Sequence, residues 1–206
     1  MEITWLGRNC FRIKGRDGAV LTDPCPPESG YRFPKQQAEI VTSSTADPGY
    51  SYGDAAAGEP RVLDAPGEYE VGGILVTGIA AKRSDGSRNV IFVCELDGIR
   101  VGHLGLIGEA PAAAVLDELK HVDILLMPVG GGNALSARLA ADVMTTIDPA
   151  IVIPMNYKTE AEQLELDPLD KFLSESGSRP EPEQKLTVNR STMPQVLTLK
   201  VLLPRG

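Results

Sequence analysis

The order in which strand-like and helix-like segments occur limits this chain to a few architectures. Up to about residue 105, short apolar or alternating runs are separated by turn pairs such as Asp17-Gly18 and Asp97-Gly98, a pattern typical of β-meanders. Beyond that point the pattern alternates, with helices expected at residues 112–120, 136–147 and 168–175 and buried strands at 124–127 and 151–153. Strands first and then alternating helices and strands predict two sheets packed face to face with helices outside.

The length and charge of the chain exclude several classes of protein. The 206 residues are expected to form one domain over residues 1–206. A net charge of -8 argues against a nucleic-acid or anionic-membrane surface, because phosphate binding needs clustered Lys and Arg. The N-terminus lacks the pattern of a signal peptide, and no apolar run approaches the roughly 20 residues of a membrane span. We therefore expect a cytoplasmic protein that binds neither nucleic acid nor membrane.

The segment from Ile40 to Tyr50 is the most informative stretch for function. An apolar β-branched run breaks into small polar residues and then into Asp47-Pro48-Gly49, which is typical of a turn. Strand ends that open into loops are common places for binding and catalytic residues.

This segment resembles the signature loop of the metallo-β-lactamase-fold hydrolases, Thr-x-Ser-His-x-His-x-Asp-His, which holds two metal ions in that family. Thr42 and Ser44 match the pattern. At the four positions where the family has metal ligands, this chain has Thr45, Asp47, Gly49 and Tyr50.

Further blocks along the chain carry the same resemblance. Gly7 to Phe11 is similar to the family's Gly-His-Ser-Cys-Phe, with Arg8 in place of His. The other blocks are Leu21-Thr-Asp-Pro24, Pro66-Gly-Glu-Tyr-Glu70, Gly102-His-Leu-Gly105, Pro128-Val-Gly-Gly131 and Ile153-Pro-Met-Asn-Tyr-Lys-Thr159. The likeness is closest to the small bacterial metal-dependent hydrolases akin to lactonases. It implies an α/β (α+β) fold, the four-layer αββα sandwich of that superfamily.

The remaining ligand positions implied by the resemblance are also substituted. Arg83 and Asn156 stand where the family has His, and Leu106 stands where it has the bridging Asp. The family uses zinc, manganese or iron, and such sites draw on several imidazoles. Only His103 and His121 are present in this chain. We therefore expect no metal site and no metal cofactor.

Two residues near the loop are candidates for catalysis. Asp47 has the chemistry of a general base, and His103 could transfer protons. The alternative interpretation makes Asp47 the first residue of a turn, accepting backbone N–H groups, and His103 a packed side chain at a strand end. We favour the alternative for both residues.

The basic residues near the loop also allow two interpretations. A cationic side chain, Arg8, Lys82 or Arg83, could enter the pocket and pair with Asp47, so that guanidinium replaces metal charge. In the second interpretation, which we prefer, these side chains are solvated on loop tips. Tyr50 and Asn156 are expected to be hydrogen-bonding plugs. Together, the residues at these positions are expected to line a preserved cleft: Arg8, Thr45, Asp47, Tyr50, Arg83, His103, Leu106 and Asn156.

Three functions follow from these residues and from the resemblance. In the first, the chain is a non-catalytic relative that binds a small molecule or a protein partner. In the second, it is an atypical hydrolase of a small ester, lactone or phosphorylated metabolite, acting with one metal or none. In the third, it is a structural subunit that assembles with itself or with an active homologue. The loss of ligand residues favours the first and third, so whether the chain is an enzyme stays open.

Overall fold

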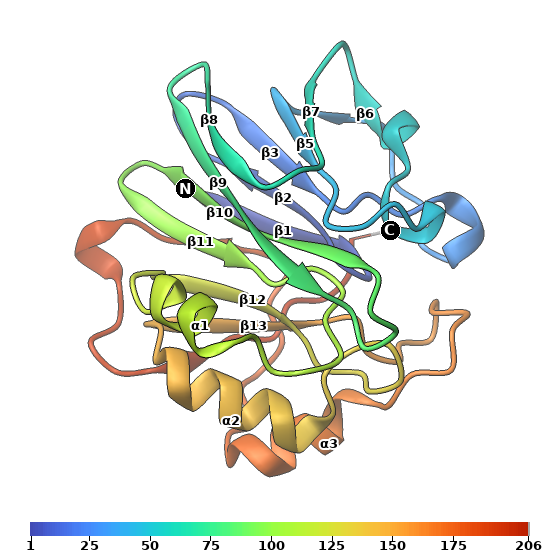
Figure 1. Ribbon diagram of the computed structural model, residues 1–206, viewed down its shortest axis with the longest axis vertical. Helices are drawn as coiled ribbons and strands as arrows, with labels where there is room; N and C mark the ends of the chain where they lie inside the picture. Colours follow the sequence, from blue (N-terminus) through green and yellow to red (C-terminus); the bar gives the residue numbers. More distant parts are fainter. Residues whose placement is uncertain (206) are drawn as a thin grey trace.

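The structure, a computed structural model, describes residues 1–205. Two mixed sheets form its centre (Figure 1). The six-stranded sheet has the order β14 (Leu186–Thr187), β1 (Glu2–Gly7), β2 (Cys10–Lys14), β3 (Ala19–Thr22), β5 (Ile40–Thr42) and β7 (Arg61–Leu63). The seven-stranded sheet has the order β15 (Thr198–Leu199), β13 (Ile151–Met155), β12 (Ile124–Pro128), β11 (Ile99–His103), β10 (Arg88–Leu96), β9 (Ile74–Lys82) and β8 (Gly67–Val71). The predicted α/β class is confirmed.

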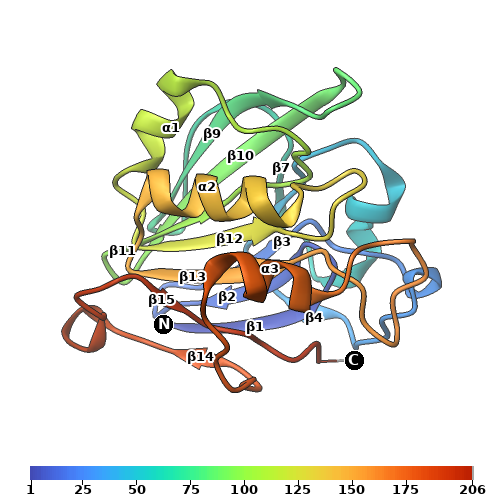
Figure 2. The same ribbon diagram turned by 90° about the horizontal axis from the view of Figure 1, so that it is seen from below.

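Within residues 1–205, three α-helices accompany the seven-stranded sheet: α1 (Ala113–Leu119), α2 (Ala137–Ile147) and α3 (Leu169–Ser176). Figure 2 shows α2 and α3 side by side near β12 and β13. Ser136 caps α2 by accepting a hydrogen bond from the backbone of Leu139. The expected apolar face of α2 is buried through Ala140, Val143, Met144 and Ile147. No helix among residues 1–205 is both long enough and apolar enough to span a membrane.

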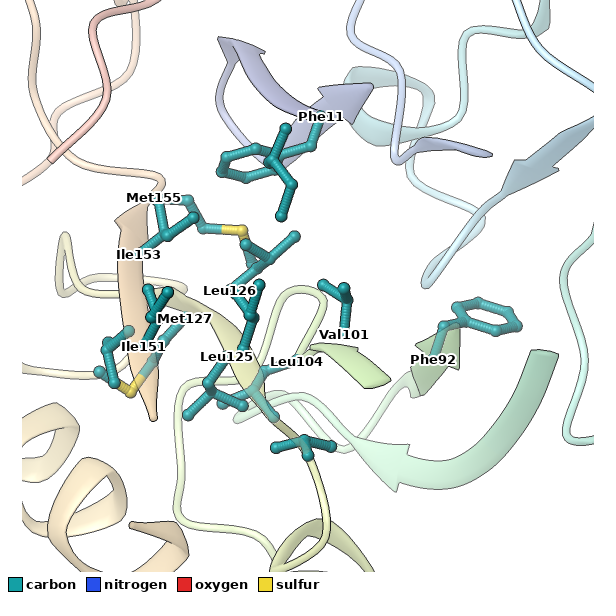
Figure 3. Packing of buried hydrophobic residues seen from close by; sticks show 14 of the residues in the cluster. Phe11, Phe92, Val101, Leu104, Leu125, Leu126, Met127, Ile151, Ile153 and Met155 are labelled. Atoms are coloured by element: carbon teal, nitrogen blue, oxygen red, sulfur yellow. The ribbon is translucent and has the colours of Figure 1, made fainter. Parts of the chain in front are cut away.

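The main hydrophobic core lies between the two sheets. Alternate residues of each strand face inward, because side chains alternate between the faces of a sheet. Figure 3 shows Phe11 of β2 facing Leu126, Ile153 and Met155 of the seven-stranded sheet. All four side chains are fully buried.

The outer face of the six-stranded sheet is covered differently. Its outward residues, among them Leu21 and Val41, pack against Tyr31 and Ala55 in a second, smaller cluster. The covering segments, residues 23–39 and 43–60, contain only short 3-10 turns and the paired two-residue strands β4 (Gln36–Gln37) and β6 (Ala56–Ala57). Loops therefore form this outer layer of the sandwich.

The topology brings distant loops to one edge. β3, β5 and β7 are parallel to one another, as are β11, β12 and β13, so their carboxyl ends lie together within each sheet. A hydrogen bond from Val90 N to Ser44 O joins the two edges. In open α/β sheets this edge is where ligands usually bind.

Candidate functional site

The candidate site is built from the carboxyl ends of four strands, β1, β5, β9 and β13. Arg8 follows β1, residues 43–50 follow β5, Arg83 follows β9 and Asn156 follows β13. Arg8 and Asn156 both adopt left-handed backbone conformations, with φ of 47° and 52°. Such conformations are uncommon for residues with a side chain. Here they change the direction of the backbone at the end of β1 and at the end of β13.

Arg8 is closed onto Glu162 inside the protein. The Nε and Nη2 atoms of Arg8 donate to the Glu162 carboxylate at 3.1 and 3.0 Å, and Nη1 donates to the carbonyl of Gly49 at 3.3 Å. The guanidinium also lies over the Tyr50 ring, 5.6 Å from its centroid. Burial lowers the pKa of Arg8, but the hydrogen bonds and charge of Glu162 raise it, and the net shift is upward. The Arg8 guanidinium is therefore charged, and its contact with the Glu162 carboxylate is bidentate.

Tyr50 and Asn156 form a second buried contact beside this ion pair. The Tyr50 hydroxyl donates to Asn156 Oδ1 at 3.1 Å, and Asn156 N donates to Arg8 O at 3.2 Å. Burial raises the pKa of Tyr50 to about 12, so its hydroxyl stays a neutral donor. Two buried polar atoms nearby, Asn156 Nδ2 and Asn133 Oδ1, have no hydrogen-bond partner.

Asp47 and Arg83 form the solvent-facing side of the site. Arg83 Nη1 lies 3.5 Å from both Asp47 Oδ2 and Thr45 Oγ1, and the side chains of Arg83 and Asp47 are 15% and 35% exposed. Asp47 Oδ1 also accepts from Gly49 N at 2.9 Å, as expected for the first residue of a turn. Asp47 therefore makes two structural contacts: it accepts the backbone N–H of Gly49 in the turn, and it pairs with Arg83.

Asp23 holds the start of the loop formed by residues 43–50 through hydrogen bonds to Ser44. Its carboxylate accepts hydrogen bonds from Ser44 N at 2.6 Å, from the Ser44 hydroxyl and from Asn9 Nδ2 at 3.4 Å, and it is fully buried. Burial raises the pKa of Asp23, and neighbouring groups, His103 and Ser44 first among them, offset only part of that shift.

His103 is also fully buried, at the end of β11. Gly105 N donates to its Nδ1 at 3.2 Å, which leaves the ring proton on Nε2, 2.8 Å from the carbonyl oxygen of Asn9. Both ring nitrogens thus bind backbone groups. The buried side chain does not reach solvent, as a proton carrier would have to. Its placement agrees with the packed strand-end interpretation.

The raised pKa of Asp23 predicts a specific pH dependence of stability. A carboxyl group whose pKa is higher in the folded state holds its proton longer there, so its contribution is full below the unfolded pKa of about 3.9 and is lost as pH rises through the folded pKa. Asp23→Asn removes this titration with little change of shape. In urea unfolding at a series of pH values from about 3 upward, the stability of the natural protein relative to Asp23→Asn should fall as pH rises. A difference that stays constant or grows with pH contradicts the expectation.

The predicted cleft is closed at most of its residues, because their side chains are buried. Arg8, Thr45, Tyr50, His103, Leu106 and Asn156 are all at most 6% exposed, and only Asp47 and Arg83 reach solvent. The preferred interpretation of the basic residues as solvated is wrong for Arg8 and Arg83, because each finds a carboxylate partner that offsets its burial. Lys82 is exposed, as that interpretation expects.

Two residues of the site were not anticipated from the sequence. Glu162 lies in the segment between β13 and α3 and supplies the carboxylate for Arg8. Asn133 lies in the loop between β12 and α2 and carries one of the orphaned atoms. Glu162 is one of several acidic residues in its loop, so only the fold distinguishes it from its neighbours.

Comparisons with known proteins relate this chain to a group of hydrolases. A UPF0173 protein of Pyrococcus furiosus is 30% identical over 187 residues, which cover 79% of this chain and 86% of that protein. The UPF0173 metal-dependent hydrolase of Methanoregula boonei is 29% identical over 185 residues, covering 77% of this chain and 83% of that protein. A crystal structure from Thermotoga maritima, provisionally described as a Zn-dependent hydrolase of the metallo-β-lactamase superfamily, matches with a TM-score of 0.82 and 31% identity, covering 98% of this chain and 97% of that one.

These relatives correct the expectation about cofactors. The sequence led us to expect no metal cofactor, because the ligand positions of the resembled motif are substituted. Relatives from several organisms are nevertheless named metal-dependent hydrolases, and the Thermotoga maritima protein is described as Zn-dependent. A metal is therefore the cofactor that the relatives imply, and substituted motif positions alone were an insufficient basis for excluding it.

The side chains present at the strand-end site do not fit the two-metal centre that the motif resemblance implies. Within the described part of the chain, no group of three or more His, Cys, Asp or Glu side chains could hold a metal ion. The carboxylates of Asp47 and Glu162 are paired with arginines, whose positive charge opposes a cation at the same place. The orphaned Oδ1 of Asn133 is a weak ligand for a transition metal, and the amide nitrogen Nδ2 of Asn156 does not bind one.

The family itself is established by the extent of the match. The model of the family described as "Beta-lactamase superfamily domain" matches residues 2–156, most of the 206-residue chain. The two-sheet architecture and the Thermotoga maritima structure agree with this match over nearly the whole chain. The chain therefore belongs to the metallo-β-lactamase superfamily and is a homologue of the UPF0173 metal-dependent hydrolases.

Proposed function

We propose that this chain is a non-catalytic member of its hydrolase family and acts by binding a small molecule. The observation that carries the proposal is that the polar side chains of the strand-end site are engaged with one another. Arg8 is closed onto Glu162, Tyr50 onto Asn156 and Arg83 onto Asp47. A hydrolytic site needs a base within hydrogen-bond reach of a substrate or water, and these groups bind protein atoms instead.

The two residues with catalytic chemistry support the same function. His103 is buried with both nitrogens hydrogen-bonded to backbone groups. Asp47 reaches solvent, but its oxygens are held by Gly49 N and the Arg83 guanidinium. Both carboxylate oxygens of Asp47 are therefore engaged with donors of the protein itself.

The proposal predicts no specific turnover. The purified protein, with zinc, manganese or iron added in separate samples, should hydrolyse carboxylic esters, lactones and phosphate monoesters no faster than the Asp47→Asn variant. The matched control is Asp85→Asn, because Asp85 is a second acidic neighbour of Arg83, 3.9 Å away, on the exposed turn after β9. Equal rates for all three proteins, near the rate of buffer, are the expected result.

Saturable turnover would overturn this function. A general base typically contributes about 10²- to 10⁴-fold to the rate. Activity that falls by about 100-fold or more in Asp47→Asn and persists in Asp85→Asn would make the chain an atypical hydrolase with Asp47 as its base.

A further inference from the structure

A cavity of about 180 Å³ lies beside the strand-end site, on the loop-covered side of the six-stranded sheet. Its walls come from the segment between β3 and β4 and the segment that follows Tyr50, which Figures 1 and 2 both show side by side in blue and cyan. The lining residues are three aromatic, three small or apolar and two charged: Tyr31, Phe33, Tyr52, Cys25, Pro27, Ala55, Lys35 and Asp54.

The interior of this cavity is apolar and aromatic. Tyr31 is buried, and its hydroxyl shares a hydrogen bond with Thr159 Oγ1 at 2.6 Å, so the ring rather than the hydroxyl is available to a ligand. Cys25 is buried too, and burial raises the pKa of its thiol, which keeps it neutral. Aromatic walls of this kind favour a flat ring, through offset-stacked and edge-to-face contacts.

The rim of the cavity carries one charge of each sign. Lys35 and Asp54 are both exposed, and neither takes part in an ion pair within residues 1–205. A ligand with a single negative charge meets repulsion from Asp54, and one with a single positive charge meets repulsion from Lys35. A ligand with both charges is attracted at each end. The rim therefore favours such a ligand over singly charged ones by repulsion as well as by attraction.

We propose that this cavity binds a single-ring aromatic compound that carries both an ammonium and a carboxylate group. An engineered cavity of about 150 Å³ holds one benzene molecule, so about 180 Å³ accommodates one ring with small substituents. The ring lies among Tyr31, Phe33 and Tyr52, the carboxylate pairs with Lys35, and the ammonium pairs with Asp54. This inference rests on the binding role proposed above and names the class of ligand.

Calorimetric titration of the full chain with three compounds of nearly equal size tests the inference. The probes are 4-(aminomethyl)benzoate, which has both charges, 4-methylbenzoate, which lacks the ammonium, and 4-methylbenzylamine, which lacks the carboxylate. We expect a Kd below about 1 mM for the first and affinities at least about tenfold weaker for the other two, since each loses a charge-assisted contact.

Substitutions in the protein test whether the probes bind in this cavity. Lys35→Ala should weaken binding of 4-(aminomethyl)benzoate about tenfold and should strengthen binding of 4-methylbenzylamine, because it removes the cation that repels the ammonium. The matched control is Lys82→Ala, because Lys82 lines a different cavity of about 300 Å³ together with Glu109, and its affinity for all three probes should equal that of the natural protein. Thermal unfolding of each variant verifies that the fold is retained.

The outcomes separate this inference from the proposed function. Equal binding of the three probes, no binding at about 1 mM, or equal effects of Lys35→Ala and Lys82→Ala would overturn the ligand class while leaving the absence of turnover standing. Probe binding that depends on Lys35, together with Asp47-dependent hydrolysis, would support the cavity and overturn the non-catalytic role.

Discussion

Replacing Arg8 by methionine should lower the free energy of unfolding by about 3–5 kcal/mol, because the substitution leaves the carboxylate of Glu162 buried without its partner. The Arg8 side chain is 7% exposed and that of Glu162 is 0% exposed, so water does not readily take over the lost contacts. Methionine keeps much of the length of arginine, which limits the contribution of a cavity. Urea unfolding of the natural protein and the variant measures the difference.

Two controls separate the ion pair from general damage. The double variant Arg8→Met with Glu162→Gln should recover part of the loss, because the second change removes the unpaired charge, and a double-mutant cycle gives the coupling between the two sites. Lys185→Ala breaks the exposed pair with Glu2, whose side chains are 50% and 33% exposed, and should cost less than about 1 kcal/mol. If Arg8→Met costs no more than Lys185→Ala, the buried pair does not hold the site together.

Gly30→Ala should destabilise the protein by about 2–5 kcal/mol, for two additive reasons. Gly30 has φ of +99°, a left-handed conformation that a side chain disfavours. A Cβ atom there would also collide with the carbonyl oxygen of Ala161, the residue before Glu162. Since a backbone atom cannot rotate away, the segment that carries Glu162 must move. The same urea titration gives the loss of stability.

Gly58→Ala is the matched control for that variant. Gly58 also has a positive φ, +77°, but a Cβ atom at this position would meet nothing within 4 Å. It therefore measures the conformational cost alone, about 1–2 kcal/mol. Losses of equal size at the two glycines would mean that the contact between residues 30 and 161 is not tight and that Gly30 does not determine the position of Glu162.

Much of the fold could be predicted because its signals are local. The alternating runs at residues 2–6 and 10–14 gave β1 and β2, and the helical spacing of residues 136–147 gave α2 within one residue. The last helix ends at Gly177, which has a φ of 67°, a left-handed conformation typical of glycine at a helix end. Side-chain periodicity and turn chemistry depend on neighbours in the sequence, which are visible without a structure.

The site was predictable only in part, because its contacts join residues far apart in the sequence. The motif positions placed Arg8, Tyr50 and Asn156 in one region, and they do meet there. The burial of Arg8 depends on Glu162, which lies 154 positions away among other acidic residues. Without that partner a buried guanidinium is too unfavourable to expect, so the Arg8 side chain was predicted to be solvated.

The two sheets differ in how firmly their outer faces are held. Helices α1 and α2 pack along the seven-stranded sheet, whereas residues 23–39 and 43–60 cover the six-stranded sheet with loops that contain few regular backbone hydrogen bonds. Segments of this kind open to solvent at a lower free energy than the core strands do. The aromatic cavity is formed by these loops, and its wall residue Tyr31 is hydrogen-bonded through Thr159 to the segment of Glu162. A molecule bound there would slow hydrogen exchange across both loops. Binding in the cavity would therefore also order the segment that carries Glu162 at the strand-end site.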